Sequence, residues 1–162
     1  MNYHIREVTL GDLDGVCFVE NSCFPLAEAA TREAFAARIN AFPERFLVAE
    51  QNEKIIGIIN GCCTTVPYLA DELYEPDCPH SLSHPWQTVF GLAVLTEYQH
   101  QGIAKALMEA LVERCKVGNQ VGVILTCKEE KIPMYEHMGF SCRGESNSCH
   151  GGAKWFDMVM EF

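Results

Sequence analysis

The sequence lacks any long apolar run: its longest hydrophobic stretches are far shorter than the ~20 residues of a membrane-spanning helix. Residues 1–10 place charged side chains among apolar ones, so we expect no secretion signal there. The nine cysteines are odd in number and include no CxxC pair. These absences predict free thiols, a reducing cytoplasmic location and no membrane partner.

Positive charge is scarce as well, with 12 Lys and Arg against 22 Asp and Glu and a net charge of −10. Nucleic acids and anionic membranes both require a positive surface, so neither is an expected partner. A cationic small substrate suits this balance, although an acidic surface that serves only solubility is the simpler explanation.

Metal ligands in a recognisable pattern are missing too. Cys78, His80 and His84 share one segment, but no fourth ligand follows at a spacing typical of zinc sites. We therefore expect no metal centre.

What remains is an ordinary globular composition in a chain of 162 residues, 48% hydrophobic and 21% charged, which predicts one domain over residues 1–162. Period-2 and β-branched patterns indicate strands, and period-3.6 patterns indicate helices. The expected strands cover residues 3–8, 45–50, 54–65, 86–95, 121–126, 140–144 and 153–162. The expected helices cover residues 11–22, 27–39, 103–117 and 129–138.

Residues 67–85 stand apart, with four prolines, four acidic residues and two histidines but little periodicity. A loop of this length within a small domain is often functional. A disordered tip is an equally good interpretation.

The most informative segment joins a buried strand to an amphipathic helix through a turn. Residues 90–94 are apolar, Gly102 lies in the turn, and the next apolar residues recur on one helix face. Glycine lets a ligand approach the backbone, and the unpaired N–H groups of a helix start attract anions. The segment predicts a pyrophosphate cradle, or else a strand–turn–helix whose glycine serves only close packing.

Two motifs resemble those of the GNAT family of N-acetyltransferases. Gln99, Gly102 and Ala104 match its Gln/Arg-x-x-Gly-x-Gly/Ala turn, and residues 133–140 match its tyrosine-bearing helix followed by Gly-Phe. The arylalkylamine (serotonin-type) enzymes are the most similar branch, on residues 23–28, 55–61 and 127–135. The resemblance implies an α/β fold with a mixed sheet of about seven strands, about four flanking helices and splayed central parallel strands.

The resemblance also implies where acetyl-CoA binds. The main chain of Leu92, Ala93 and Val94 would hold the pantetheine arm, where the parallel strands beside Val94 and Val121 splay apart. The turn and helix start would surround the pyrophosphate with Gln99, His100, Gln101, Gly102, Ile103, Ala104 and Lys105.

For catalysis, the N–H of Val94 is the expected oxyanion donor. By resemblance Tyr135 is the general acid for the leaving thiolate, and a half-buried core aromatic is the alternative role. The serotonin-type enzymes carry two histidines at the positions that are Thr88 and Phe90 here. Neither residue accepts a proton near neutral pH, so His84 and Glu28 are the remaining candidate bases.

The acceptor would be a small-molecule primary amine, with an arylalkylamine as first choice and a polyamine or protein amine as alternatives. By resemblance its apolar pocket would be lined by Pro25, Leu26, Trp155 and Met158. Asp71, Glu72, Glu75 and Asp77 would attract a cation at the mouth. A CoA or metabolite sensor without turnover is the competing function, and a homodimer is compatible with either.

Overall fold

The computed structural model describes residues 2–75, 80–148 and 150–162. In these ranges the chain forms nine strands and four α-helices. The helices are α1 (Leu13–Cys23), α2 (Arg32–Ala41), α3 (Ile103–Val117) and α4 (Ile132–His137). The strands are β1 (His4–Glu7), β2 (Phe46–Gln51), β3 (Lys54–Asn60), β4 (Cys63–Thr64), β5 (Trp86–Val89), β6 (Gly91–Val94), β7 (Gly122–Cys127), β8 (Ser141–Glu145) and β9 (Phe156–Glu161).

The strands form two sheets rather than one sheet of seven. The first has the order β1-β2-β3-β6 and is antiparallel throughout. The second has the order β4-β5-β7-β9-β8, in which only β5 and β7 run parallel. Two of the expected strands divide, residues 54–65 into β3 and β4 and residues 86–95 into β5 and β6, so each contributes to both sheets.

The chain crosses between the sheets where two backbones approach closely. At Gly61, between β3 and β4, an added Cβ would lie 2.0 Å from the carbonyl oxygen of Thr88. Phe90, between β5 and β6, donates its N–H to the carbonyl of Asn60 over 2.7 Å. Only a residue without a side chain fits at Gly61, and this contact fixes where the first sheet ends and the second begins.

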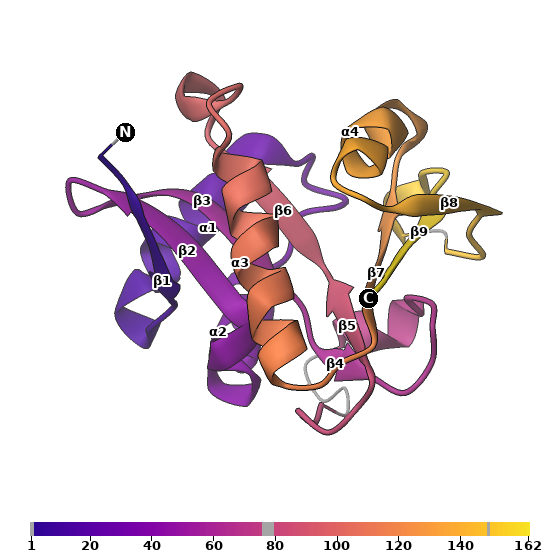
Figure 1. Ribbon diagram of the computed structural model, residues 1–162. Coiled ribbons are helices and arrows are strands. Elements are labelled where there is room, and N and C mark those ends of the chain that lie inside the picture. The colour runs from indigo at the N-terminus through magenta and orange to yellow at the C-terminus, as the bar shows by residue number, and fades with distance from the viewer. Residues whose placement is uncertain (1, 76–79, 149) are drawn as a thin grey trace.

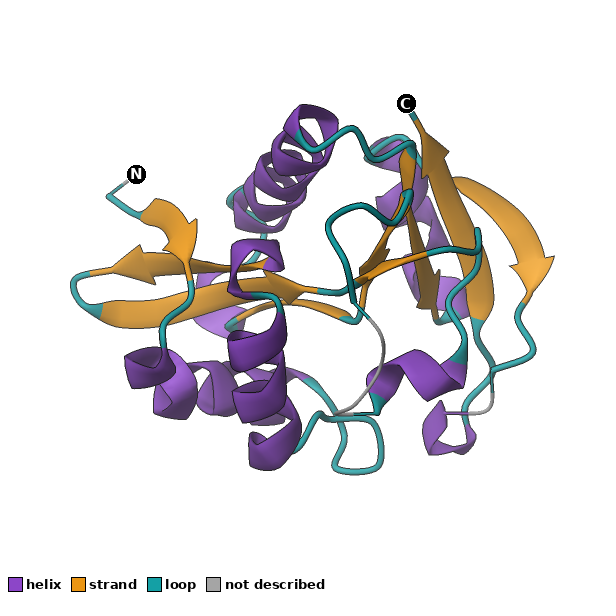
Figure 2. Cartoon of the chain, turned by 90° about the horizontal axis from the view of Figure 1, so that it is seen from below, coloured by secondary structure: helices purple, strands orange, loops and turns teal. Residues whose placement is uncertain are grey.

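The first sheet is covered on both faces. α3 packs on one face, and α1 with α2 covers the other (Figure 2). Ile55, Ile56, Ile58 and Ile59 of β3 are all at most 7% exposed, which confirms the prediction that this strand is buried on both sides. The second sheet lies at an angle to the first, with α4 against β8 and β9 (Figure 1).

Two expected segments differ in their bounds. The helix predicted over residues 27–39 begins only at Arg32, because the Thr31 hydroxyl accepts the N–H of Ala34 and caps the helix there. The predicted loop at residues 67–85 contains a 3₁₀ turn, Asp71–Tyr74. No helix in the described ranges is long and apolar enough to cross a bilayer.

Candidate active site

The two parallel strands in the middle of the molecule separate towards their carboxyl ends. β5 pairs with β7 from Trp86 opposite Gly122 to Val89 opposite Leu125, whereas β6 pairs with β3 instead. The strands therefore splay beside Val94, as predicted, but remain paired at the other end, next to Val121. A pocket of about 740 Å³ opens in the splay, lined by α1, β6, β7, α4 and the turn before α3.

The edge of β6 that faces the pocket carries free main-chain donors. The N–H of Leu95 donates to Ile56 of β3 over 2.9 Å. Because alternate residues of a strand direct their amides to opposite sides, the N–H groups of Leu92 and Val94 point away from β3 and into the splay. Both residues, with Ala93 between them, line the pocket.

Two residues in the turn after β6 have a left-handed backbone conformation. Gly102 precedes α3 with φ 84°, and His100 has φ 61°. The helical hydrogen bonds of α3 begin with Ala106, whose N–H donates to Gly102 over 3.0 Å, so the preceding amides of the helix remain available to an anion.

Gln99 connects this turn to β6, since its Nε2 donates to the carbonyl of Val94 over 2.9 Å. Of the residues expected around a pyrophosphate, all but one line the pocket. The exception is Gln101, whose Nε2 donates to Glu97 over 3.4 Å instead. The residues that line it are Gln99, His100, Gly102, Ile103, Ala104 and Lys105.

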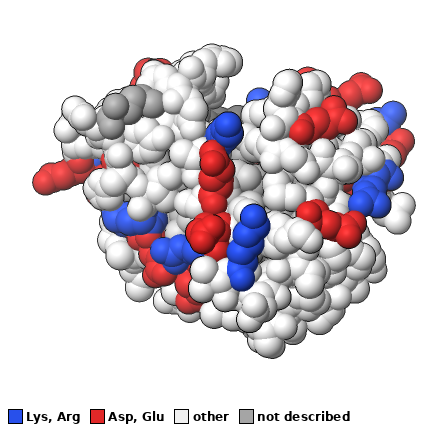
Figure 3. Space-filling model, viewed as in Figure 1, with Lys and Arg blue, Asp and Glu red and all other residues white. Residues whose placement is uncertain are grey.

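Local positive charge offsets the acidity of the chain at the pocket. Lys105, at the start of α3, and Lys131 line it, whereas Lys128, which also lines it, is paired with Glu28 and lies over the ring of Trp155. Elsewhere the charges are mixed: along the exposed face of α3, acidic side chains lie between basic ones at either end (Figure 3). The helix start, the free β6 edge and these lysines fit the anionic and amide groups of a CoA thioester.

Tyr135 lies in α4 at the pocket wall. It is 8% exposed, its ring packs edge-on against Phe140 at 5.7 Å, and burial raises the pKa of its hydroxyl above the ordinary value. Tyr135 therefore contributes to the core and also lines the pocket, so a structural role and a chemical role are compatible.

Glu20 is the residue that sequence reasoning missed. It lies on the buried stripe of α1 with Val16 and Val19 and is 5% exposed, yet it lines the pocket. Its Oε2 accepts the N–H of Ala30 over 2.8 Å, and its Oε1 has no hydrogen-bond partner among the described residues. The sequence signal that could have identified it is a glutamate at a helix position where the pattern calls for an apolar residue.

Burial raises the pKa of the Glu20 carboxyl above its ordinary value of 4.5. The Ala30 N–H, the Arg38 guanidinium on α2 and the His150 ring on the 3₁₀ turn His150–Gly152 oppose this rise. Tyr74, Cys17 and Cys23 are further titratable groups close to Glu20. Glu20 thus lines the pocket, and its carboxyl is easier to protonate than that of an exposed glutamate.

The two bases expected from sequence lie in different surroundings. Glu28 lines the pocket and pairs with Lys128, with Oε2 and Nζ 2.7 Å apart. His84 is not among the pocket-lining residues, and its Nδ1 lies 3.1 Å from the carbonyl of Cys63. Thr88, at one of the histidine positions of the serotonin-type enzymes, is buried and donates its hydroxyl to Cys62 over 2.8 Å.

The histidines of the 67–85 segment contact the main chain of an edge strand. The Nδ1 of His80 accepts the N–H of Cys63 over 3.0 Å, so His80 and His84 hold both main-chain groups of one β4 residue. Cys78, considered as a third ligand, lies outside the described residues. Within them, no three His, Cys, Asp or Glu side chains are grouped to hold a metal.

Only half of the expected acceptor residues reach the pocket. Pro25 and Trp155 line it, but Leu26 and Met158 do not. Leu26 is 91% exposed in the turn between α1 and α2, and Met158 is fully buried in the core on β9. Of the four acidic residues expected at the mouth, Glu75 lines the pocket and Asp77 lies outside the described residues.

Four rings lie together on this side of the pocket. Tyr74 lies 4.8 Å from Phe90 and stacks on His150 at 5.0 Å, and His150 lies 6.1 Å from Trp155. All four line the pocket. Burial raises the pKa of Tyr74 to about 12, although a hydrogen bond with Thr126 opposes the rise.

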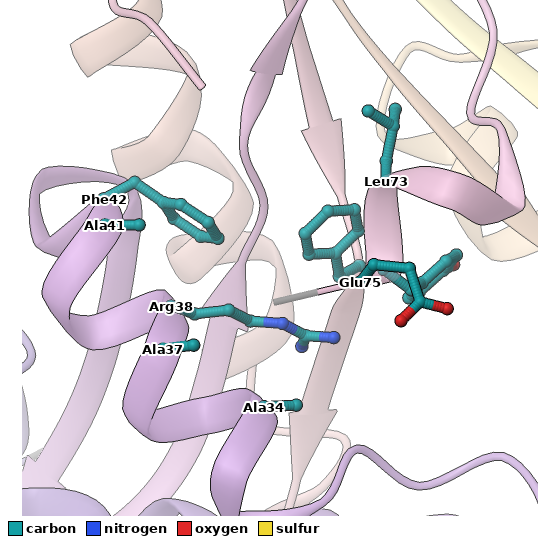
Figure 4. Close-up of a pocket in the computed structure, with 9 residues that line it drawn as sticks. Ala34, Ala37, Arg38, Ala41, Phe42, Leu73 and Glu75 are labelled. Atoms are coloured by element: carbon teal, nitrogen blue, oxygen red, sulfur yellow. The ribbon is translucent and has the colours of Figure 1, made fainter. Parts of the chain in front are cut away.

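A side pocket of about 10 Å³, roughly the size of one water, adjoins this aromatic cluster. Arg38 extends into it from α2 toward the segment that carries Leu73 and Glu75 (Figure 4). The Arg38 guanidinium lies 4.6 Å from the centre of the Phe90 ring, and its Nη1 donates to Oδ1 of Asn60 over 3.0 Å.

Comparison with known proteins agrees with this architecture. The profile of a family described as "Acetyltransferase (GNAT) domain" matches residues 43–142. Human N-acetyltransferase 8 is 29% identical over 107 residues, which cover 64% of this chain but only 41% of that protein.

Two solved structures share the fold over the full length of both chains. Naa50 of Arabidopsis thaliana, in complex with the bisubstrate analogue CoA-Ac-MVNAL, has a TM-score of 0.76 and 16% identity over 100% of each chain. The PaiA N-acetyltransferase of Thermoplasma acidophilum, in complex with coenzyme A, has a TM-score of 0.75 and 16% identity over 100% of each.

A mixed α/β domain with splayed parallel strands and a helix-start anion cradle defines the class as a GNAT-fold acyltransferase domain. The matched family profile covers most of the chain, and the chain belongs to the GNAT acetyltransferase family.

Proposed function

We propose that this protein transfers the acetyl group of acetyl-CoA to a primary amine that attacks the thioester directly. The observation that carries the proposal is the meeting, in one pocket, of the free N–H edge of β6 with the buried carboxyl of Glu20. The N–H groups of β6 can bind the thioester, and the carboxyl of Glu20 can accept a proton from the amine. Family membership and the CoA complexes of Naa50 and PaiA support acetyl-CoA as the donor.

The donor would bind along β6, with its pyrophosphate at the start of α3. Val94 offers its main-chain N–H to a pantetheine amide, and Gln99 keeps the turn in register with Val94. Lys105 lies at the helix start, where its charge adds to that of the free amides. This arrangement recruits an anion locally, although the chain as a whole carries a net charge of −10.

We assign the oxyanion donor to the N–H of Leu92 in place of Val94. Glu20 approaches β6 at Gly91, where its Oε1 would lie 3.6 Å from an added Cβ. A strand rises about 3.3 Å per residue, so Leu92 is adjacent to this point and Val94 is roughly 10 Å away. The reacting carbonyl and the base must be close together, which favours Leu92.

Glu20 is the general base in this proposal, in place of His84 and Glu28. Glu20 lines the pocket and its Oε1 has no hydrogen-bond partner among the described residues, whereas Glu28 is paired with Lys128 and His84 is bound to Cys63. Its raised pKa brings the carboxyl closer to the pKa of the groups from which it must take a proton.

Tyr135 is the proposed general acid. Its hydroxyl holds its proton more firmly than a free tyrosine, because burial raises its pKa. It therefore stays protonated until a strong base, the leaving thiolate, forms beside it.

The proton and electron balance is simple. The neutral amine forms a C–N bond to the acetyl carbon while the C–S bond breaks, and the sulfur keeps the electron pair. One amine proton goes to Glu20, and the Tyr135 hydroxyl gives one proton to the thiolate. Glu20 and Tyr135 return to their starting states by exchange with solvent.

An arylalkylamine remains the first choice of acceptor. The rings of Tyr74, Phe90 and Trp155 offer aromatic contacts, while Glu20 and Glu75 favour a cationic amine in the approach.

Two contacts between loops also close over the acceptor side of the pocket, which favours a small molecule as the acceptor. The His150 ring lies 3.1 Å from the carbonyl of Glu28, and Ser148 donates to Asp71 over 2.6 Å. These contacts join the segments on three sides of the acceptor pocket and leave little room for the surface of a folded protein. Polyamines and peptide amines are the alternatives that the experiment below separates.

Thiol release from acetyl-CoA, measured with a panel of amines, tests this function. We expect release with arylalkylamines, at rates above those with polyamines, lysine side chains or peptide N-termini. Fast release with peptides instead would exclude the small-molecule acceptor. Tight CoA binding in calorimetry with no release across the panel would exclude an enzyme and favour a sensor.

A further inference from the structure

The closed end of the splay, where β5 and β7 remain paired, is apolar. The last pair of this ladder is Val89 opposite Leu125, and both residues line the pocket. Val89 is 4% exposed and Leu125 is 2% exposed. Leu125 is paired in turn with Met158 of β9, which is fully buried. Paired residues of a sheet direct their side chains to the same face, so these three form one apolar row across three strands.

The shape of a thioester determines which part of the donor meets this row. Its carbonyl carbon has three substituents in one plane. In the proposed function the sulfur comes from the α3 end of β6, beside Val94, and the carbonyl oxygen faces the N–H of Leu92. The third substituent is the acyl chain, and it points away from both of the others. It is therefore directed toward β7 and the closed end of the splay.

The side chains behind the row are packed as well. Val123, two residues before Leu125 on β7, is fully buried, as is Met158 on the other side of Leu125. Because protein interiors are close-packed, each carbon added to the acyl chain beyond the available space must displace such side chains. A charged acyl group would also place its carboxylate against hydrocarbon without a partner, which is strongly unfavourable.

We propose that Val89 and Leu125 limit the length of the acyl group, so that the donor is a CoA thioester with a short, uncharged acyl chain. The role of these residues rests on the proposed function, and it adds which thioesters the protein accepts. The bond changes are the same for every chain: the C–N bond forms, the C–S bond breaks, and the sulfur leaves with the electron pair and receives a proton. Val89 and Leu125 determine specificity, since they touch only the acyl chain.

Val89→Ala is the variant that tests the proposal. It removes two methyl groups from the closed end of the splay, and a butyryl group is two carbons longer than an acetyl group. Val123→Ala is the matched control, because the same two methyl groups are removed from a buried residue two positions before Leu125 on β7. Val123 is not among the described residues that line the pocket. Both variants lose buried volume, so their melting temperatures are measured in parallel.

The readout is thiol release from acetyl-, propionyl- and butyryl-CoA with one arylalkylamine. For the wild type we expect kcat/KM to fall about tenfold or more for each added carbon. Val89→Ala should raise the ratio of kcat/KM for butyryl-CoA to that for acetyl-CoA about tenfold or more, whereas Val123→Ala should keep the wild-type ratio. The folded fraction cancels in this ratio, because the same active molecules use both thioesters.

Two further measurements change the available space and the charge in the opposite sense. Val89→Ile adds one carbon at the same place, so it should lower the ratio of propionyl-CoA to acetyl-CoA below that of the wild type. Succinyl-CoA, whose acyl chain ends in a carboxylate, should release thiol with neither the wild type nor any of these variants.

A wild type that uses butyryl-CoA as well as acetyl-CoA would overturn the proposal, as would a butyryl-to-acetyl ratio in Val89→Ala equal to that of Val123→Ala. Thiol release from succinyl-CoA at the acetyl-CoA rate would refute the uncharged donor. Absence of release from every thioester would refute the proposed function instead. Calorimetric affinities for butyryl-CoA and acetyl-CoA then give the same ratio without turnover, and an unchanged ratio in Val89→Ala would still overturn the role of Val89.

Discussion

At the scale of single residues, the chemistry depends on side chains that occupy places normally held by apolar ones. Glu20 lies one residue after Val19 on the stripe of α1 that packs on the sheet. The sequence contained this signal, because a charged residue on a buried helix face rarely occurs without a reason. Its free oxygen was not predictable, since that depends on the N–H of Ala30, which binds only the other oxygen.

Ionised Glu20 should destabilise the protein. Its folded-state pKa is raised above that of the unfolded chain, so the stabilising effect of the bound proton is complete below about pH 4.5 and is lost as the pH rises through the folded pKa. Glu20→Gln, which resembles the protonated form, should therefore melt at a higher temperature than the wild type at pH 7.5. The difference should disappear at pH 4, and calorimetry at both pH values measures it. A lower melting temperature at pH 7.5 would contradict the account.

Tyr135→Phe removes the proposed acid while keeping the ring that packs on Phe140. We expect kcat to fall about 10²-fold, with CoA affinity changed by less than about twofold, because general acid catalysis contributes 10²–10⁴-fold. Steady-state kinetics and calorimetry give the two values. A fully active variant would assign Tyr135 to the core alone.

At the scale of elements, the motif that identified the pyrophosphate turn works through backbone geometry. Gly102 has φ 84°, and an added Cβ would meet nothing within 4 Å, so glycine is needed there for its conformation and not for space. Gln99 holds the turn by donating a hydrogen bond to the carbonyl of Val94. A sequence motif shows the glutamine but not this main-chain partner.

Gly102→Ala should lower the free energy of unfolding by about 1–2 kcal/mol, the typical penalty for a left-handed alanine. It should also weaken CoA binding about tenfold or more, since the amides at the start of α3 would shift. Denaturant unfolding and calorimetry test the two effects. Gly11→Ala, with its nearest neighbour at 3.5 Å, is the control that should change neither, and equal behaviour of the two variants would refute the turn assignment.

The helices and strands were predictable where the hydrophobic periodicity was strong. The prediction was wrong where long-range contacts determine where a strand ends. All four helices and the strands of the core follow the sequence pattern. The division of residues 54–65 and 86–95 between two sheets depends on the contact of Gly61 with Thr88, which is long-range. The pocket residues Tyr74 and His150 come from loops, where sequence periodicity carries no information.

At the scale of the whole molecule, a buried arginine helps to join the two sheets. Arg45, 4% exposed before β2, donates Nη1 to Gln87 of β5 and Nη2 to Gln120, each over 3.0 Å. The same Nη1 lies 3.3 Å from the Cys115 sulfur on α3. One side chain therefore connects the first sheet, the second sheet and α3 on the side opposite the splay.

Arg45→Met should lower the free energy of unfolding by about 2–4 kcal/mol, because two buried amide oxygens lose a donor. Arg143→Met is the matched control: Arg143 pairs with Glu161 in solvent at 3.0 Å and should contribute less than about 1 kcal/mol. Urea denaturation of both variants measures the difference. Equal stability of the two would show that Arg45 does not hold the sheets together.

The proposed enzyme depends above all on Glu20, which takes the amine proton in the pocket between β6 and β7. The most direct measurement is the pH–rate profile of CoA release from acetyl-CoA with a saturating arylalkylamine, for the wild type and Glu20→Gln. We expect the wild-type rate to rise with pH through the raised pKa of Glu20, and we expect the variant to be about 10²–10⁴-fold slower and to lack that limb. A variant with the wild-type rate and the same limb would contradict this expectation.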